Sequence, residues 1–278
     1  MEKDNTRKEM AGGIPRLGVT ILASGSSGNC TIVHYGNQAV MIDAGLSGRE
    51  MQRRFRQCRC LEGIEIQGIL VTHEHTDHIS GLRTCSEKLE APIYATANCA
   101  RTIRAKDSKI KQMATFAAGG SFDIGPFSVT SFSIPHDAND PVAFIITVNE
   151  QRIGIATDVG YVSSTVEYRL NGCDALVLES NHDINMLAAS ARPWSLKQRI
   201  MGRNGHLSND SSAQLLEKII SPNTRKIVLA HLSHECNTQE KALECAGQAI
   251  HELRRNDILL TVAQQEVPLE TVWLEAGE

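Results

Sequence analysis

The amino-acid sequence predicts an α/β fold in which strands and helices alternate along the chain. Short runs of Val, Ile, Leu and Thr recur between Gly, Asn and Pro residues, as in buried strands. Segments with the apolar spacing of amphipathic helices separate many of these runs. The 278 residues are 41% hydrophobic and 22% charged, which is typical of a globular protein and not of a disordered or fibrous one.

The predicted strands occur in both halves of the chain. Gly36 and Asn37 favour a hairpin turn between two of the early strands. The runs that predict strands are 17–24, 31–35, 38–45, 67–73, 92–96, 126–134, 141–149, 151–158, 174–180, 225–231 and 257–263.

Three segments have the pattern of helices. Ser47 and Glu50 have the spacing of a capping box, which predicts a helix through about Gln57. Residues 208–221 and 239–254 carry apolar side chains at helical spacing after polar starts. Because no linker, repeat or low-complexity segment divides the chain, we expect one domain over 17–278, preceded by a flexible leader over 1–16.

The composition limits both function and location. Lys and Arg total 28 against 32 Asp and Glu, and the resulting charge of −4 argues against indiscriminate coating of nucleic acid. The eight cysteines form no CxxC pair, so we expect reduced thiols in a cytoplasmic protein. No apolar stretch approaches the roughly 20 residues of a membrane-spanning helix, and we expect no membrane partner.

Residues 70–82 carry the strongest functional signal. Their sequence, LVTHEHTDHISGL, places His73, His75, Asp77 and His78 directly after an apolar strand. Residues two apart in extended chain project to the same side, so the first two histidines can face one point while Asp77 and His78 face a second. Imidazole and carboxylate ligands suit zinc, manganese or iron, and these residues do not distinguish the three metals.

Further ligands are expected at other strand ends, because a site at one edge of stacked sheets collects side chains from several loops. His136, Asp158 and His231 each stand at the end of a predicted strand. His234 is an alternative to His231, which we prefer because it lies directly at its strand end.

In combination, these motifs resemble those of the metallo-β-lactamase fold hydrolases. HEHTDH corresponds to the HxHxDH motif of that family, and Asp43 in MIDAG corresponds to its preceding aspartate motif. The resemblance implies an αββα four-layer sandwich with two divalent metal ions at one edge. The resemblance also implies that one metal is bound by His73, His75 and His136, and the other by Asp77, His78 and His231. It further implies that Asp158 bridges the two metals and that Asp43 supports the ligand loop.

Other local motifs resemble one branch of that family, the YycJ/WalJ group of bacterial DNA exonucleases. They are ASGSSGNC (23–30), LESNHD (178–183), PWSLKQRI (193–200), GHLSND (205–210) and HLSHECN (231–237). The resemblance implies hydrolysis of DNA by a hydroxide bound to the metals. Since a site of this kind can also attack a thioester, a lactone or a β-lactam, residues outside the metal shell must select the substrate.

Three residues are expected to act in catalysis. Asp77 belongs to the metal motif, and His182 and His206 lie in the LESNHD and GHLSND motifs. Either histidine can donate a proton to the leaving oxygen or hydrogen-bond a phosphate oxygen. The alternative for each of the two is a structural or solvent-facing histidine.

Two further features concern the substrate. The Gly/Ser loop 24–29 either presents backbone N–H groups to a phosphate or is simply a tight connection between strands. Basic residues gather over 49–59, 101–111 and 192–203, and such runs are usually solvated faces. The third run lies between the two catalytic histidine motifs, so we expect it to border the active site and meet a phosphate backbone.

We therefore interpret the chain as a two-metal phosphodiesterase that acts on DNA as an exonuclease. The alternative is a small-molecule hydrolase of the same fold, cutting a thioester, lactone or cyclic phosphodiester. A di-iron redox protein fits less well, because those proteins usually have glutamate where this chain has His75. A metal-stabilised interaction module would need a closed site. The residues leave open the cleavage polarity, the choice of DNA or RNA, and the oligomeric state.

Overall fold

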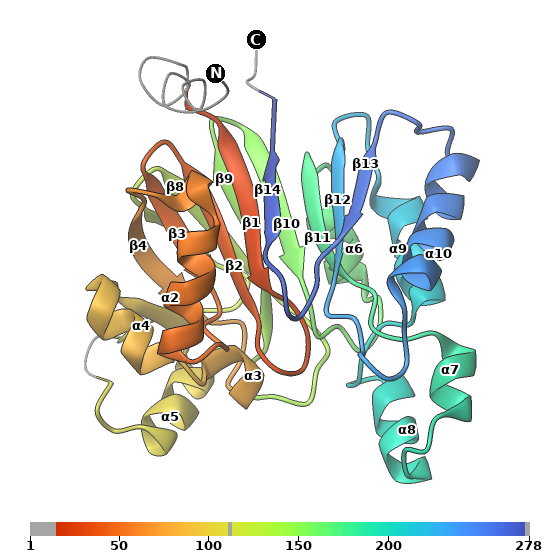
Figure 1. The fold of residues 1–278 in the computed structure, drawn as a ribbon, viewed down its shortest axis with the longest axis horizontal. Helices are drawn as coiled ribbons and strands as arrows, with labels where there is room; N and C mark the ends of the chain where they lie inside the picture. The colour runs from red at the N-terminus through yellow and green to blue at the C-terminus, as the bar shows by residue number, and fades with distance from the viewer. Residues whose placement is uncertain (1–14, 111–112, 276–278) are drawn as a thin grey trace.

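Two seven-stranded β-sheets pack face to face, and helices cover the outer face of each sheet (Figure 1). This computed structural model describes residues 15–110 and 113–275. The arrangement confirms the predicted αββα sandwich. The expected leader lies outside the described residues except for Pro15 and Arg16.

The first sheet has the strand order β14-β1-β2-β3-β4-β5-β6. Its strands are β1 (Leu17–Ala23), β2 (Cys30–Tyr35), β3 (Gln38–Ile42), β4 (Glu65–Leu70), β5 (Ile93–Thr96), β6 (Met113–Phe116) and β14 (Leu269–Trp273). Strands β3 to β6 run parallel to one another. The loops after β3 and β4 therefore lie at the same edge of the sheet.

The second sheet has the order β13-β12-β11-β10-β9-β8-β7. Its strands are β7 (Ser121–Ile124), β8 (Phe127–Ser133), β9 (Val142–Val148), β10 (Gln151–Ala156), β11 (Ala175–Glu179), β12 (Lys226–Ala230) and β13 (Leu259–Val262). Because β10 to β13 are parallel, the loops that follow β10, β11 and β12 meet at one edge.

Six of the helices cover the two outer faces. The elements are α2 (Gly48–Gln57), a 3-10 turn (Arg59–Leu61), α3 (Thr76–Ile79), α4 (Leu82–Leu89), α5 (Ala97–Lys106), α6 (Ser164–Leu170), α7 (Ile184–Ala189), α8 (Trp194–Met201), α9 (Asn209–Ile219) and α10 (Gln239–Glu252). Apolar residues of α2, α4 and α5 pack on the first sheet, and those of α6, α9 and α10 pack on the second.

A third apolar layer lies between the sheets. Val33 and Val40 of the first sheet belong to the same buried cluster as Phe127 and Phe144 of the second. Successive side chains of a strand point to opposite faces of its sheet. Every second side chain therefore faces the central layer, and the others face the helices. The two sheets are therefore fixed against each other, and so are the loops at their edges.

Every predicted strand and helix has a counterpart in the structure, but β6, β7 and β14 were not predicted. All three are edge strands. Most of their residues are exposed or only partly buried, so these strands lack the apolar runs that mark the central strands. At α2, the Ser47 hydroxyl accepts the Glu50 N–H as the capping box predicts.

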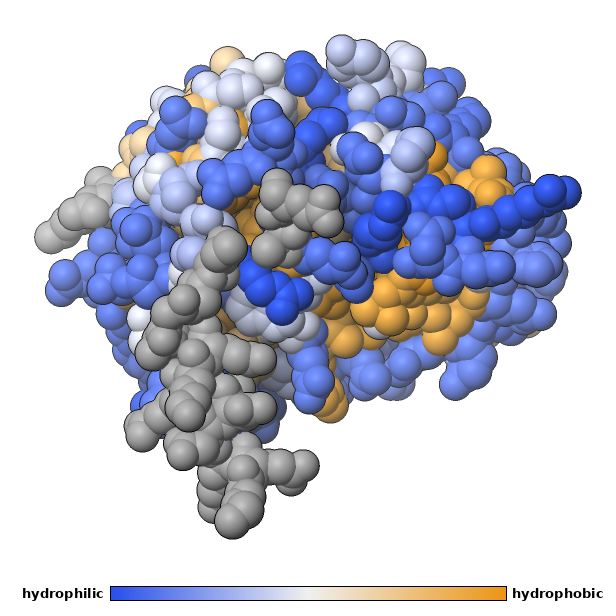
Figure 2. All heavy atoms as spheres, turned by 90° about the horizontal axis from the view of Figure 1, so that it is seen from above, coloured by the Kyte–Doolittle hydropathy of each residue, from blue (hydrophilic) through white to orange (hydrophobic). Residues whose placement is uncertain are grey.

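The end of the sandwich at which β1 begins and β14 ends lies opposite the loops after β10 and β12 (Figure 1). Figure 2 looks onto that end, which is largely hydrophilic with apolar areas between the polar side chains. Among the described residues, no helix has both the length and the apolar character needed to cross a bilayer. All eight cysteines are free thiols, as expected.

Candidate metal centre

The predicted ligands come from four loops at one edge of the sandwich. His73 follows β4, and His75 is the N-cap of α3, which contains Asp77 and His78. His136, Asp158 and His231 follow β8, β10 and β12. Loops at the ends of parallel strands thus bring together residues that are far apart in sequence, as expected from the sequence.

Both predicted ligand trios form in the structure. One group consists of His73, His75 and His136, and the other consists of Asp77, His78 and His231. Within each group, the ligand atoms lie within 4.8 Å of one another. A third group of this kind joins His73 and His78 to Asp158. The arrangement fits two neighbouring divalent cations.

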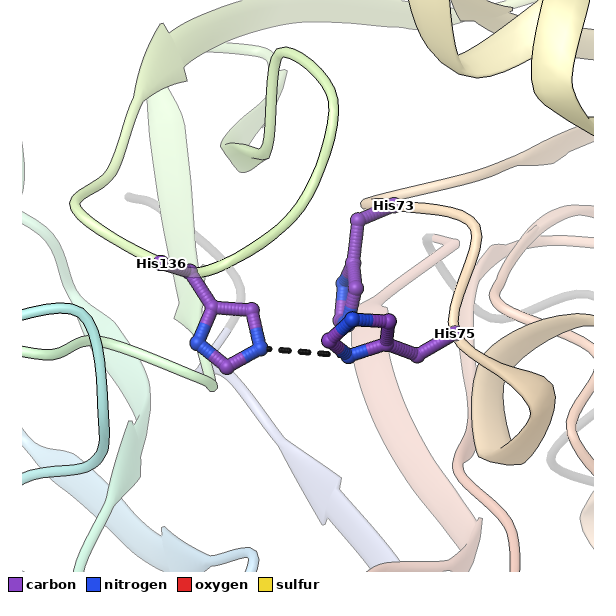
Figure 3. A group of neighbouring side chains, drawn as sticks. All are labelled: His73, His75 and His136. Atoms are coloured by element: carbon purple, nitrogen blue, oxygen red, sulfur yellow. Dashed lines mark hydrogen bonds between the residues drawn. The ribbon is translucent and has the colours of Figure 1, made fainter. Parts of the chain in front are cut away.

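The first trio has the spacing of ligands that share a metal (Figure 3). The Nε2 atom of His136 and the Nδ1 atom of His75 are 3.3 Å apart. Two nitrogens bound to a tetrahedral zinc at 2.0–2.1 Å would be about 3.3 Å apart. The ring centres of His73 and His75 are 4.5 Å apart, and the two rings meet edge to face. His136 packs against both of these rings, so the three imidazoles surround one point.

Asp158 lies between the two trios. One carboxylate oxygen is 3.2 Å from Nε2 of His78, and the other is 3.8 Å from Nε2 of His136. The Asp158 carboxylate therefore faces a histidine of each trio, as its implied bridging role requires. Burial alone would raise its pKa, but His231 and His78 hold the pKa of Asp158 well below its ordinary value.

Three buried polar atoms in this cluster have no hydrogen-bond partner among the described residues. They are Nε2 of His73, Oδ2 of Asp158 and Nε2 of His231. Buried polar atoms are normally paired, and an unpaired group is costly. A divalent cation accepts lone pairs from these atoms, so the residues present fit the metals implied by the motifs.

Strained backbone marks the strand ends that carry the cluster. Asp43, Asp158 and His231 adopt φ values of 59°, 60° and 56°. This left-handed region favours glycine, and other residues adopt it at a cost of about 1–3 kcal/mol that the surrounding structure must offset. Three such residues within two positions of the ends of β3, β10 and β12 indicate that their side chains are needed there.

Asp43 supports the ligand loop as the motif implied. Its carboxylate accepts both the backbone N–H and the hydroxyl of Thr72, each at 2.8 Å. It also lies 2.7 Å from Nδ1 of His78, which leaves Nε2 of that ring to face Asp158. A carboxylate behind a histidine in this way fixes the ring and its tautomer.

Glu179 plays the same part on the other side of the cluster, and sequence reasoning missed it. This fully buried carboxylate ends β11, and Oε1 lies 2.8 Å from Nδ1 of His231 and 2.9 Å from Nδ1 of His206. The backbone N–H groups of Val159 and Leu207 donate to Oε2. Burial alone would raise its pKa, but His206 and His231 lower the pKa of Glu179 to about 2.

The two candidate proton donors lie in different surroundings. His206 joins Asp158, Glu179 and His231 in a fourth group of ligand-type atoms. Burial would lower its pKa, yet Glu179 and Asp158 raise the pKa of His206 above its ordinary value. His182 is buried and belongs to none of the groups found among the described residues, and burial lowers its pKa to about 4.

The cluster is open on one side. The side chains of His73 and His231 are almost fully buried, whereas those of His75, Asp77 and His206 are 30%, 24% and 22% exposed. A substrate must therefore approach past these three residues. His234, the alternative to His231, is exposed in a turn outside the cluster.

The Gly/Ser loop is a tight strand connection. Its N–H groups at Ser24, Gly25, Ser27, Gly28 and Asn29 already donate to protein oxygens. The idea that the loop cradles a phosphate through its backbone is therefore not supported. Instead, the Asn29 amide lies 3.1 Å from Nε2 of His78, so the loop lines the second trio.

The third basic run borders the site, but its four cations differ in their contacts. The Nε atom of Arg192 lies 2.9 Å from a carboxylate oxygen of Glu235. The Lys197 ammonium is buried and donates to two backbone carbonyls. Arg199 pairs with Asp137, the residue after His136. Arg203 stacks on Tyr161, with 4.4 Å between the guanidinium and the ring centre.

Each of the other two basic runs contains a cation that donates to backbone carbonyls. Arg54 is buried and donates to the backbone carbonyls of Leu22 and Gln265. In the run 101–111, the Lys106 ammonium donates to the Glu74 carbonyl, and Lys111 lies outside the described residues.

Comparison with known proteins places this site in a family. Residues 38–232 match the family described as the beta-lactamase superfamily domain. Exodeoxyribonuclease YycJ of Bacillus anthracis is 37% identical over 241 residues, covering 85% of this chain and 90% of that protein. Exodeoxyribonuclease WalJ of Streptococcus pneumoniae is 33% identical over 229 residues, covering 80% and 84%.

The fold is also similar to a solved structure. The metallo-β-lactamase fold protein YhfI from Bacillus subtilis superposes with a TM-score of 0.68 over 91% of this chain and 99% of that one. At 15% identity, this likeness concerns the fold alone.

Proposed function

The chain belongs to the beta-lactamase superfamily, within its YycJ/WalJ branch, and from this premise we propose that it is a metal-dependent exonuclease acting on DNA. The observation that carries the proposal is the likeness, over most of both chains, to proteins named exodeoxyribonuclease. The complete set of ligand-type side chains at the sandwich edge supports it.

We assign two divalent metals, zinc, manganese or iron, to the two trios. His73, His75 and His136 would hold one, and Asp77, His78 and His231 the other, with Asp158 between them. When bound, such metals lower the pKa of a coordinated water and neutralise charge on a phosphate. No side-chain nucleophile is then required.

The chain's own residues orient the ligands and supply a proton. Asp43 and Glu179 accept from Nδ1 of His78 and His231, which directs Nε2 of each ring to the cluster. His206 is partly exposed at the open side, and Glu179 favours its protonated form. We assign to His206 the donation of that proton to the leaving oxygen of the DNA backbone. His182 stays a predicted second donor.

The test is incubation of metal-loaded protein with end-labelled linear single- and double-stranded DNA, RNA, and a chromogenic phosphodiester. An exonuclease shortens linear DNA stepwise from an end and leaves a circular single strand of the same sequence intact. Hydrolysis of the chromogenic diester alone would contradict the proposal and favour a small-molecule hydrolase. Cleavage of the circle would instead indicate an endonuclease.

A further inference from the structure

Helices α7 and α8 form an arm beside the metal centre. The arm, residues 183–205, is inserted between β11 and α9 and extends past the strand ends at the metal edge (Figure 1). The site described above uses no residue of this arm as a ligand. Its role is therefore not explained by the metal centre.

The arm is fastened directly to the wall of the site. The carbonyl of Gly205, at its end, lies 3.2 Å from Nδ1 of His136. Arg199 of α8 donates to Asp137, whose other oxygen is 3.4 Å from Nε2 of His136. Gly160 packs so closely on Arg203 that a methyl group added at Gly160 would clash with the Arg203 carbonyl. The orientation of α8 towards the cluster is thus fixed.

Within the arm, α8 is buried along one side. Ile200 is buried, and the Lys197 ammonium donates to the carbonyls of Ala188 and Ser190 at the end of α7. Lys197 therefore ties the two helices together and is not available to a phosphate.

The rest of the α8 surface is exposed and carries large side chains. Trp194 is 64% exposed and Met201 is 43% exposed, and they share one margin of this exposed side at helical spacing. Arg199, whose side chain is 63% exposed, stands five residues after Trp194 at the other margin of the exposed side, and Arg203 follows the end of α8. Exposed aromatic rings for the bases, combined with cations for the phosphates, are the usual platform for an unpaired strand.

We propose that the exposed side of α8 is a platform for a single DNA strand, which crosses the helix so that a base stacks on Trp194 and a phosphate contacts Arg199. The proposal rests on the exonuclease function proposed above. A single strand fits because its bases offer open π-faces, whereas those of a duplex are stacked on their neighbours. Stacking of this kind tolerates any base, as an exonuclease requires.

Trp194 can report its own contact. The chain has two tryptophans, so Trp273→Phe leaves Trp194 as the only one. Metal-loaded Trp273→Phe protein is titrated with a thymidine oligonucleotide of about 12 residues, built with hydrolysis-resistant phosphorothioate links. We expect quenching of Trp194 emission by this strand, and little quenching by an abasic strand of equal length or by a blunt duplex. Equal quenching by all three would overturn base stacking.

Binding of the same labelled strand, followed by fluorescence polarisation, gives an independent measurement. Trp194→Ala should weaken binding about 5-fold to 150-fold, with Trp194→Phe in between. Arg199→Ala should weaken binding and lower the slope of log affinity against log salt by about one. Tyr168→Ala, which removes a 78% exposed aromatic ring from α6, is the matched control and should bind normally.

The outcomes separate the two proposals. If wild-type protein degrades linear DNA but Trp194→Ala and Arg199→Ala bind the strand as tightly as wild type, the platform is wrong and the nuclease function stands. If wild-type protein degrades no DNA, the proposed function is wrong, and the quenching experiment still decides whether the arm holds a strand.

Discussion

Buried carboxylates behind histidines recur at this centre. Asp43 accepts from His78, and Glu179 accepts from both His231 and His206. The effect on the rings is electrostatic: burial alone would lower the pKa of His231, but Asp158, Asp77 and Glu179 raise it to about 10. The same negative charge that holds protons without metal attracts divalent cations, which displace those protons on binding.

Glu179→Gln tests this support at a single residue. The amide keeps the shape but removes the charge that raises the pKa of His206. A proton donor is active below its pKa, so the fall in DNA hydrolysis at high pH should begin at a lower pH in the variant. The maximal rate should drop about 10- to 100-fold. Glu167→Gln on α6 is the exposed control and should keep the wild-type pH profile. An unchanged pH profile for Glu179→Gln would argue against the supporting role of Glu179.

His34 gives a pH-dependent contribution to stability away from the metal ligands. Its ring is fully buried in β2 against Trp273, and burial lowers its pKa from 6.5 to about 4. The unfolded chain takes up a proton near pH 6.5 but the folded chain does not, so stability falls as pH drops from 6.5 towards 4. Between pH 7 and pH 5 this loss is about 2 kcal/mol.

His34→Phe keeps a ring beside Trp273 and removes this titration. Urea unfolding at pH 7 and pH 5 should show a smaller loss of stability for the variant than for wild type. Other histidines contribute equally to both proteins and cancel in the comparison. The same loss in both proteins would show that His34 does not titrate as described.

At the residue scale, the sequence was sufficient to predict which candidate ligands lie together, but not to predict Glu179 beside them. The ligands were predictable because each follows an apolar run that ends at a common edge. Glu179 carries no such signal, since its partners His206 and His231 are 27 and 52 residues away. The only available sign was a carboxylate directly at the end of the apolar run ALVL.

At the scale of elements, apolar runs predicted the central strands and missed three edge strands. An edge strand pairs with a neighbouring strand along one edge only, and its other edge is exposed to solvent. For this reason β6, β7 and β14 mix polar and apolar residues. The short helices of the arm were also not predicted. They are held by caps and by Lys197 rather than by a long apolar stripe.

The arm offers a prediction at this scale. Asp183 is the N-cap of α7, accepting the Met186 N–H at 2.7 Å, and it also pairs with Lys241 of α10. Asp183→Ala removes both contacts and should lower the free energy of unfolding by about 1 kcal/mol. Asp183→Asn retains a cap and should lose less. Equal urea midpoints for Asp183→Ala and wild type would show that the cap contributes nothing.

For the whole molecule, the charge of −4 is compatible with a polyanionic substrate. Acidic groups such as Asp43, Asp77 and Asp158 lie within or behind the metal cluster, where cations would offset them. Exposed Arg199 and Arg203 stand beside the same edge. Cations are thus available beside the site, while the net negative charge argues against general coating of nucleic acid.

Metal removal should destabilise the molecule as a unit. Without cations, buried carboxylates and unpaired imidazole atoms remain at the point where both sheets end. A ligand present at about 1,000 times its dissociation constant stabilises the folded state by about 4 kcal/mol. Chelation should therefore lower the melting temperature, and added zinc or manganese should restore it. A melting temperature indifferent to chelator would contradict the proposed metal sites.

Metal content and DNA hydrolysis, measured on the same protein samples, decide whether Asp158 serves a two-metal nuclease site. Wild-type protein and the control Asp123→Ala, at an exposed residue of β7, should bind two metals per chain and shorten linear DNA. Asp158→Ala, like His75→Ala, should lose metal and hydrolysis together. If Asp158→Ala kept two metals and full activity, Asp158 would not have the role proposed for it.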